Sequence, residues 1–162
     1  NLNGNAAGLV RFQVQDDGIT SGGGQNLDST PNTLTINITS VNDAPAGADK
    51  TKAVDEEGTM TFTAADFGFT DPVDAASAAG ANALTAVKIT SLPLAGTLTL
   101  GSTSVLKDQS IPVGQIGQLQ FKPATNANGV AYASFTFQVQ DNGGGANGGG
   151  ESRGLLVDNN RQ

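Results

Sequence analysis

The chain has 162 residues, which is the size of one domain, or of one domain and a fragment. It contains no Cys and no His, so disulfides, haem ligation, the usual zinc sites and the Ser-His or Cys-His nucleophiles of hydrolases are excluded. Eight Lys and Arg against 15 Asp and Glu give a net charge of −7, which disfavours nucleic acid as a partner and suits a hard cation such as Ca²⁺.

The first predicted elements lie at the start of the chain. Residues 9–15 are expected to form a strand, and a glycine-rich loop follows them. Residues 33–41 then alternate Leu and Ile with Thr and Asn, which is the period-2 pattern of a half-buried strand. The stretch 41–45 predicts a boundary, because Pro45 has no N–H and keeps the residue before it extended.

The rest of the chain predicts short strands joined by turns. Strands are expected at residues 50–54, 59–63, 85–92, 96–100, 104–106, 109–112, 119–122 and 131–140. Residues 64–69 predict a turn with two aromatic anchors, 71–82 a polar loop and 112–118 one helical turn. No long helical pattern competes, so the expected fold class is all-β, an antiparallel β-sandwich; a barrel or a β-solenoid is the alternative.

An internal repeat divides the chain. Residues 12–18 (FQVQDDG) match residues 137–143 (FQVQDNG), 125 positions later, and the Asn-Gly pair at 3–4 matches the pair at 128–129. The match continues, with one added residue, through two glycine-rich stretches. The chain is therefore expected to hold the end of one repeat and most of a second. No alternating strand like 33–41 ends the second copy, so this copy is expected to lack its last strand.

Six motifs follow one another along the chain. They are VNDAP (41–45), FTAADF (62–67), FTDP (69–72), AVKIT (86–90), GTL (96–98) and SFTFQVQD (134–141). In this order they resemble the cadherin-like (Ig-like) tandem repeats of large bacterial surface adhesins of the RTX and VCBS types. The resemblance implies an Ig-like β-sandwich in arrays that extend an adhesive tip or build a matrix. It also implies that calcium often rigidifies the array, and it implies no enzymatic activity.

The repeat and the resemblance together predict three parts. Residues 1–41 are the C-terminal strands of a preceding repeat, 42–150 an Ig-like sandwich that lacks its last strand, and 151–162 a tail without a counterpart in the family. Such a sandwich has an apolar groove and an unpaired edge, which an extended segment with alternating apolar side chains can fill. Residues 1–41 are the candidate donor of that segment.

The candidate donor residues are Leu34, Ile36, Ile38, Val41, Leu9, Phe12 and Val14. Because the short link at 42–45 is expected to place the donor away from its own groove, a neighbouring copy would receive it. Repeated head-to-tail, this contact makes an open filament. The alternatives are a donor that folds back on its own sandwich, and a chain that is a slice of a longer array.

A calcium site is the second candidate. Ca²⁺ takes six to eight oxygen ligands, and acidic residues lie in many of the predicted turns and strand ends. The candidates nearest the expected domain ends are Asp16, Asp43, Glu56 and Asp141. The alternative is that Asp and Asn favour turns because their side chains bond to the local backbone.

Catalysis is the weakest candidate. Asp71 and Asp74 form a carboxylate pair of the kind that glycosidases use. With one Tyr and no Trp, however, the chain hardly supplies the aromatic cleft that such enzymes need, and a carbohydrate-binding module lacks support for the same reason. The protein is therefore not expected to be an enzyme.

The sequence thus predicts a structural subunit of an extracellular bacterial filament or matrix that polymerises by β-strand donation. Its expected partners are other copies of itself and a cell surface or matrix, with no nucleic acid and no membrane insertion. A passive, calcium-stiffened extender repeat of a long cell-surface adhesin is the alternative. No basic and apolar leader follows Asn1, so no signal peptide is expected in this sequence.

Overall fold

The computed structural model describes residues 4–77, 80–144 and 152–159, the last of these by their backbone. The chain divides after Ser40. A first unit contains the residues before this point together with Ser77, and a second contains Val41–Ala76 and the chain from Gly80 onward. We call them the hairpin unit and the sandwich unit.

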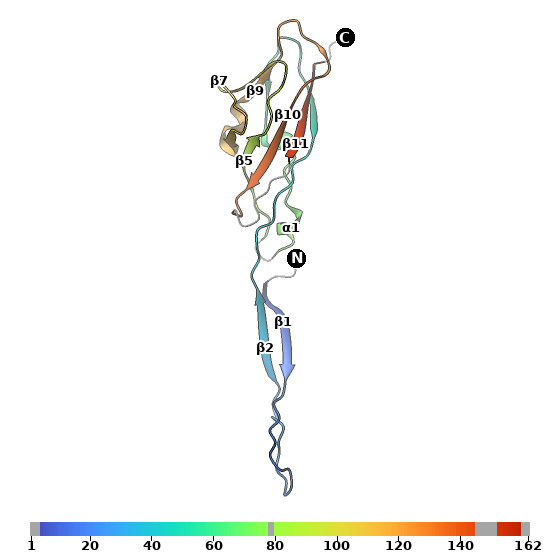
Figure 1. Ribbon diagram of the computed structural model, residues 1–162, viewed down its shortest axis with the longest axis vertical. Coiled ribbons are helices and arrows are strands. Elements are labelled where there is room, and N and C mark those ends of the chain that lie inside the picture. The colour runs from blue at the N-terminus through green and yellow to red at the C-terminus, as the bar shows by residue number, and fades with distance from the viewer. Residues whose placement is uncertain (1–3, 78–79, 145–151, 160–162) are drawn as a thin grey trace. The chain divides into compact units, whose positions relative to one another are not determined.

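The hairpin unit contains an antiparallel two-stranded ribbon (Figure 1). β1 (Gly4–Phe12) pairs with β2 (Asn32–Ile38), and all seven residues of β2 are exposed. Beyond the strands, a bridge between Gln15 and Leu27 keeps the two arms together. A two-stranded hairpin on its own is only marginally stable in water, so this ribbon gains little stability from its own contacts.

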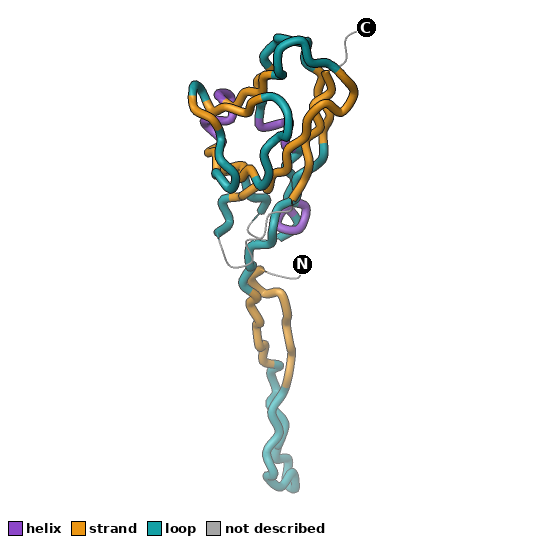
Figure 2. The backbone as a smooth tube through the Cα atoms, turned by 45° about the horizontal axis from the view of Figure 1, so that its top comes forward, coloured by secondary structure: helices purple, strands orange, loops and turns teal. Residues whose placement is uncertain are grey.

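The described residues of the sandwich unit form a five-stranded and a four-stranded β-sheet (Figure 2). The larger sheet has the order β3-β11-β10-β5-β8, with bounds β3 (Lys50–Ala53), β11 (Ser152–Asn159), β10 (Gly129–Asp141), β5 (Leu84–Ile89) and β8 (Ser110–Pro112). The smaller sheet has the order β4-β9-β6-β7, with bounds β4 (Met60–Thr61), β9 (Leu119–Lys122), β6 (Thr97–Leu100) and β7 (Thr103–Ser104). The helical segments are η1 (Ala64–Phe67), α1 (Pro72–Ala75) and η2 (Val113–Gln118).

Paired strands in the described residues run antiparallel, except that β3 and β11 are parallel. The prediction of an all-β, antiparallel sandwich is therefore confirmed.

The hydrophobic core lies between the two sheets. Over most of its length β10 alternates buried with more exposed side chains, as the period-2 pattern predicts, and Phe135 and Phe137 are fully buried. Phe135 meets Phe62 and Phe137 meets Phe67 in T-shaped contacts, with ring centroids 5.6 Å and 4.9 Å apart. Other large buried side chains are Val87, Ile89, Ile111, Ile116, Leu119, Phe121 and Val139.

The helical turn η1, which carries the buried Phe67, is fixed at both ends. Asp66 Oδ2 accepts hydrogen bonds from Thr63 N (2.7 Å) and from Lys52 Nζ (2.8 Å). Burial alone raises the pKa of Asp66, but the hydrogen bonds from Lys52 and Thr63 and the Lys52 charge outweigh it, so the pKa lies below its usual value. Gly68 ends η1 with a φ of 56°, and a Cβ there would overlap Ala48, so glycine is required.

The C-terminal strand corrects the expected organisation. Residues 152–159 form β11, which pairs antiparallel with β10 and parallel with β3 (Figure 1). The prediction that residues 42–150 form a sandwich without a last strand, followed by a tail at 151–162, is therefore wrong at this point, because β11 occupies the position expected to be vacant. A strand between two others is specified by both neighbours, and its sequence reads as a short apolar run rather than as an alternation.

Candidate functional site

Three acidic residues from two elements form the candidate site, which we call the Asp cluster (Asp71, Asp74 and Asp141). Asp71 caps α1, because its Oδ1 accepts a hydrogen bond from the backbone N–H of Asp74 at 3.3 Å. Pro72 suits the first position of this helix, where no N–H donor is needed. Asp141 is the last residue of β10. The cluster thus joins a helix start to a strand end far away in the sequence.

The Asp cluster is compact and buried. One carboxylate oxygen of each residue lies within 4.8 Å of the other two. Asp71, Asp74 and Asp141 are 7%, 2% and 8% exposed. Oxygen ligands of one Ca²⁺, each roughly 2.3–2.6 Å from the ion, lie no more than about 5 Å apart. The three oxygens are therefore spaced as ligands of a single ion would be.

Two asparagines hold the Asp cluster together. Asn42 donates from Nδ2 to Asp141 Oδ1 (3.4 Å) and to the carbonyl oxygen of Gly144 (3.0 Å). Asn82 donates from Nδ2 to Asp74 Oδ2 (3.0 Å) and to Oδ1 of Asn42. Asn42 comes from the boundary predicted at 41–45, so this boundary is part of the site.

Backbone N–H groups from three segments also point at the cluster. The N–H of Asp43 donates to Asp74 Oδ2 at 2.9 Å. The N–H of Asn82 donates to Asp71 Oδ2 at 3.0 Å, and that of Gly143 donates to Asp141 Oδ1 at 3.0 Å. These bonds fix the orientation of all three carboxylates.

One oxygen of the cluster remains unsatisfied. Asp141 Oδ2 is buried and has no hydrogen-bond partner among the described residues, which is a costly arrangement. None of the ion pairs found between described residues includes a member of the cluster. At a separation of 4.8 Å, two carboxylates repel by about 3.5 kcal/mol at an effective dielectric constant of 20. A cation among them would offset this repulsion and give the unsatisfied oxygen a partner.

The donor atoms fit a hard divalent cation. Besides the carboxylates, Asn42 Oδ1 and the carbonyl oxygen of Gly144 lie beside the cluster as neutral oxygen donors. Ca²⁺ accepts six to eight oxygens in flexible geometry, whereas Mg²⁺ demands near-ideal octahedral geometry and retains several waters. The irregular arrangement of carboxylate, amide and carbonyl oxygens therefore suits Ca²⁺ better than Mg²⁺.

Glycine at position 143 allows the chain to close on the site. A Cβ on Gly143 would overlap the side-chain amide of Asn42 and crowd Nδ2 of Asn82. The neighbouring residues are also in contact, because Asn142 Oδ1 accepts a hydrogen bond from the N–H of Ala83 at 2.8 Å. The segment after β10 is therefore packed against the segment before β5 without room for a side chain at 143.

The structure places the four predicted calcium ligands in different regions. Asp141 lies in the cluster, and Asp43 contributes its backbone N–H to it. Glu56 lies in the turn between β3 and β4. Asp16 belongs to the hairpin unit, where its Oδ1 accepts a hydrogen bond from the N–H of Gly18 at 2.9 Å. Neither Glu56 nor Asp16 is part of the metal-ligand group found among the described residues.

From the sequence, Asp71 and Asp74 belong to the acidic residues of turns and strand ends that are considered for calcium, but not to its preferred ligands, and they also form the weak catalytic pair. The structure places both in the Asp cluster. The Asp-Pro-x-Asp spacing is a helix-capping signal, and such a cap brings the two carboxylates close together. The spacing does not show that this cap meets the end of β10, because that contact depends on tertiary packing.

The hairpin unit carries a second feature, the apolar face, defined by Val10, Phe12, Val14, Leu34, Ile36 and Ile38. These side chains are between 43% and 59% exposed. Val10 lies opposite Leu34 and Gly8 lies opposite Ile36, so these positions point to the same side of the ribbon. A Cβ on Gly8 would lie 3.5 Å from the Ile36 side chain, in ordinary contact.

The predicted donor residues are all exposed, but they do not form one face. Leu9 lies opposite Thr35, on the other side of the ribbon from the apolar face. Val41 belongs to the sandwich unit and lies outside its described strands. Val10, which the sequence reasoning missed, is part of the face. The internal repeat contains the signal for it, because Val10 aligns with the buried Phe135.

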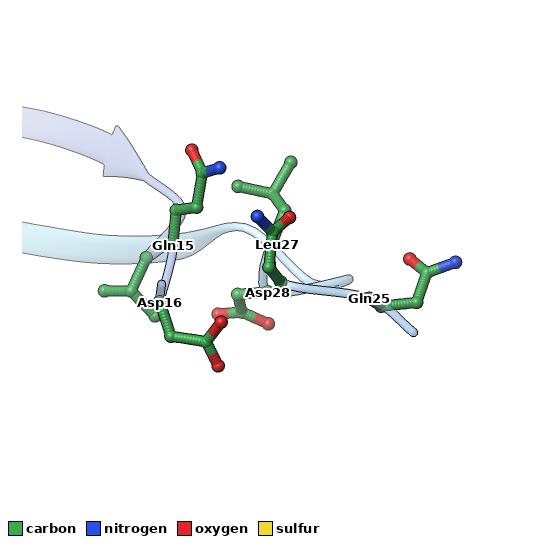
Figure 3. Close-up of a pocket in the computed structure, with 7 residues that line it drawn as sticks. Gln15, Asp16, Gln25, Leu27 and Asp28 are labelled. Atoms are coloured by element: carbon green, nitrogen blue, oxygen red, sulfur yellow. The ribbon is translucent and has the colours of Figure 1, made fainter. Parts of the chain in front are cut away.

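An open hollow lies on the arms beyond β1 and β2, lined by Gln15, Asp16, Leu27 and Asp28 among others (Figure 3). Asp28 N donates to the carbonyl oxygen of Val14 at 2.8 Å, which holds the arms together. The hydrogen bond from the backbone of Thr30 is the main cause that lowers the pKa of Asp28. The Asp28 carboxylate thus stabilises the local turn at Thr30.

In the part of the chain that the structure describes, no helix has the length and apolar character needed to cross a membrane. Comparison with known proteins gives no match, either to a family model, to a curated protein or to a solved structure. The resemblance to cadherin-like repeats therefore rests on the sequence motifs, and the Asp cluster and the apolar face are the structural features from which function can be inferred.

Proposed function

We propose that the protein is a calcium-binding structural repeat, an Ig-like β-sandwich of an extracellular bacterial protein without enzymatic activity. The observation that carries this proposal is the Asp cluster. Its three carboxylates converge in a buried position, and Asp141 Oδ2 has no hydrogen-bond partner among the described residues. The resemblance of the sequence to cadherin-like adhesin repeats supports the Ig-like type and the location outside the cell.

A bound ion would have a mechanical effect. The carboxylates accept hydrogen bonds from the backbone at Asp43, Asn82 and Gly143, which come from three separate segments. The first of these lies in the boundary segment that leads into the sandwich. Calcium would therefore fasten this entry segment to α1 and to the end of β10. A ligand that binds only the folded state also stabilises it, so the repeat would be most rigid where calcium is abundant.

The same geometry argues against catalysis by the carboxylates. Asp71 and Asp74 accept hydrogen bonds from backbone N–H groups and are at most 7% exposed. Glycosidase carboxylates must reach a bound sugar and, in inverting enzymes, leave space for a water. The cluster offers a cage for a small ion rather than a cleft for a substrate.

Calorimetric titration with Ca²⁺ tests the proposal. The expected result is one ion per chain, with a dissociation constant on the order of 10⁻⁴–10⁻³ M, as in other extracellular calcium modules. Asp74→Asn is expected to abolish binding. Asp17→Asn makes the same change of charge at an exposed position of the hairpin unit and should leave binding unchanged. If the unchanged protein binds no calcium, or if both variants lose it equally, the proposal is wrong.

A second candidate function is a filament made by strand donation between copies, which the exposed apolar face favours. Since β11 lies between β10 and β3, donation into the sandwich of another copy requires that its own terminal strands leave. Electron microscopy and mass measurement in solution decide the matter. Uniform fibres that survive a chelator would support the filament, whereas monomers of 16.3 kDa would exclude it.

A further inference from the structure

The hairpin β1–β2 reproduces the register of the hairpin β10–β11. Along β1 the residues at 4, 8, 10 and 12 lie opposite 38, 36, 34 and 32 of β2. Along β10 the residues 125 positions later, at 129, 133, 135 and 137, lie opposite 159, 157, 155 and 153 of β11. Each β2 position therefore corresponds to the β11 position 121 residues later.

The two hairpins also share an irregularity. The register of β1–β2 shifts between Gly4 and Gly8, and that of β10–β11 shifts between Gly129 and Ala133. Within these bulges Ala6 has a φ of 56° and its counterpart Ala131 a φ of 52°. Left-handed backbone is uncommon for alanine, so its recurrence at equivalent positions shows that both hairpins have the same local structure.

The equivalent side chains differ in their surroundings. In β10 the residues Ala133, Phe135, Phe137 and Val139 are at most 5% exposed, because they pack into the core of the sandwich. Of their counterparts Gly8, Val10, Phe12 and Val14, the three with apolar side chains beyond Cα are 44–59% exposed. The apolar face is thus the core-facing side of a terminal hairpin that has no core to cover within its own unit.

The body of a second copy, meaning its strands from β3 to β9, is a poor partner for this face. Each copy has one such body and two hairpins of the same type, and β10–β11 already covers it. Exchange would replace Phe135 and Ala133 by the smaller Val10 and Gly8. Phe137 and Val139 would be matched by the identical Phe12 and Val14, so in this strand the core would lose apolar volume. Such an exchange gains no apolar contact that could offset the entropic cost of association.

We infer that the apolar face docks on a further sandwich body, made of strands equivalent to β3–β9 and linked ahead of the hairpin in the same polypeptide. β1 then lies beside the counterpart of β5, as β10 lies beside β5, and β2 lies beside the counterpart of β3, as β11 lies beside β3. This inference rests on the proposed role as a structural repeat, and it names the partner of the hairpin unit and the register of the contact.

A tandem chain tests the inference. A copy of residues 42–125 is fused directly before Asn1, which keeps the spacing of the internal repeat. Leu156 of β11 lies opposite Thr51 of β3, so the register places Thr35 of β2 opposite Thr51 of the added copy. Both threonines are exposed and the protein has no cysteine, so a Thr35→Cys/Thr51→Cys pair provides an unambiguous disulfide.

Oxidation by oxidised glutathione is expected to join these cysteines within one tandem chain, which shifts its mobility on a non-reducing gel. A matched control places the second cysteine at Thr103 of the added copy, an exposed position on β7 in the other sheet, and should not cross-link. Hydrogen exchange gives a readout without cysteines. The backbone amides of residues 32–38 should exchange about 100-fold more slowly in the tandem chain than in the original chain, because docking protects them.

Two results would overturn the inference. One is a tandem chain with neither the disulfide nor slower exchange. The other is a disulfide between two molecules of the original chain that carries Thr35→Cys and Thr51→Cys, because the partner would then be a second copy. All measurements are made in chelator and again in calcium. A protein that binds no calcium but cross-links as expected would refute the calcium site alone, so the two proposals fail separately.

Discussion

Replacement of Asp141 by Asn is expected to stabilise the protein without calcium and to remove most of the stabilisation that calcium provides. Without calcium, the substitution removes one of three buried negative charges and turns the region around Oδ2 into a neutral amide that can donate to the remaining carboxylates. Each repulsion removed is about 3.5 kcal/mol at 4.8 Å and an effective dielectric constant of 20. Because the folded structure relaxes, we expect a net gain of about 2–3 kcal/mol.

With calcium, this advantage is expected to disappear. An ion at 100 times its dissociation constant stabilises the unchanged protein by about 2.7 kcal/mol. Asp141→Asn loses a charged ligand and with it most of this gain. The difference in stability between the two proteins should therefore shrink towards zero as the calcium concentration rises.

Urea unfolding at constant ionic strength, in chelator and in excess calcium, measures both effects. Asp17→Asn controls for the change in net charge and should show neither the gain nor the loss. The reasoning is refuted if Asp141→Asn is less stable than the unchanged protein in chelator, or if calcium stabilises both proteins to the same extent.

Three further predictions concern the sandwich unit. Gly143→Ala forces a Cβ into the amide of Asn42 and should cost about 2–4 kcal/mol in urea unfolding, whereas Gly117→Ala, where nothing lies within 4 Å of the added atom, should cost far less. Phe137→Ala empties a fully buried site and should cost about 3–5 kcal/mol; a cost below about 1 kcal/mol would contradict the assigned core. Asp66 has a lowered pKa in the folded state, so its contribution is present above the usual value of 3.8 and is lost as the pH falls through the folded value. The free energy of unfolding of Asp66→Asn should therefore be lower than that of the unchanged protein at pH 6, and the two values should converge in acid. A difference that stays constant down to pH 2 would be inconsistent with a lowered pKa.

Local patterns predicted much of the sandwich. The alternation in 131–140 anticipates β10, and the prediction of a strand at 119–122 matches β9. These segments have one face in the core, so their sequence carries the period of the strand. β11 was missed, since its place between β10 and β3 is determined by pairing with strands distant in the sequence.

The Asp cluster was only partly predictable. Asp141 is a sequence candidate because it is acidic and lies near an expected domain end, and that reasoning holds equally for Asp16 and Glu56, which lie outside the cluster. Asp71 and Asp74 are held together by the helix cap, by Asn82 and by the backbone N–H of Asp43 in the boundary segment. This convergence arises from packing over sequence separations of up to 102 residues, and single-sequence patterns do not report it.

The apolar face illustrates a different limit. Alternation identified Leu34, Ile36 and Ile38 as one side of a strand, and the structure agrees. The pattern could not say which residues of the neighbouring arm share that side, so Leu9 was chosen and Val10 was missed. Register between two strands depends on the turn and on the bulge at Gly4 to Gly8, which are fixed only when the pairing is known.

A crystal structure of the protein grown in calcium shows whether the Asp cluster holds an ion. We expect anomalous density for one ion roughly 2.3–2.6 Å from oxygens of Asp71, Asp74 and Asp141, with Asp141 Oδ2 among its ligands. Clear density for these side chains with water alone between them, in crystals containing millimolar calcium, would refute the calcium site.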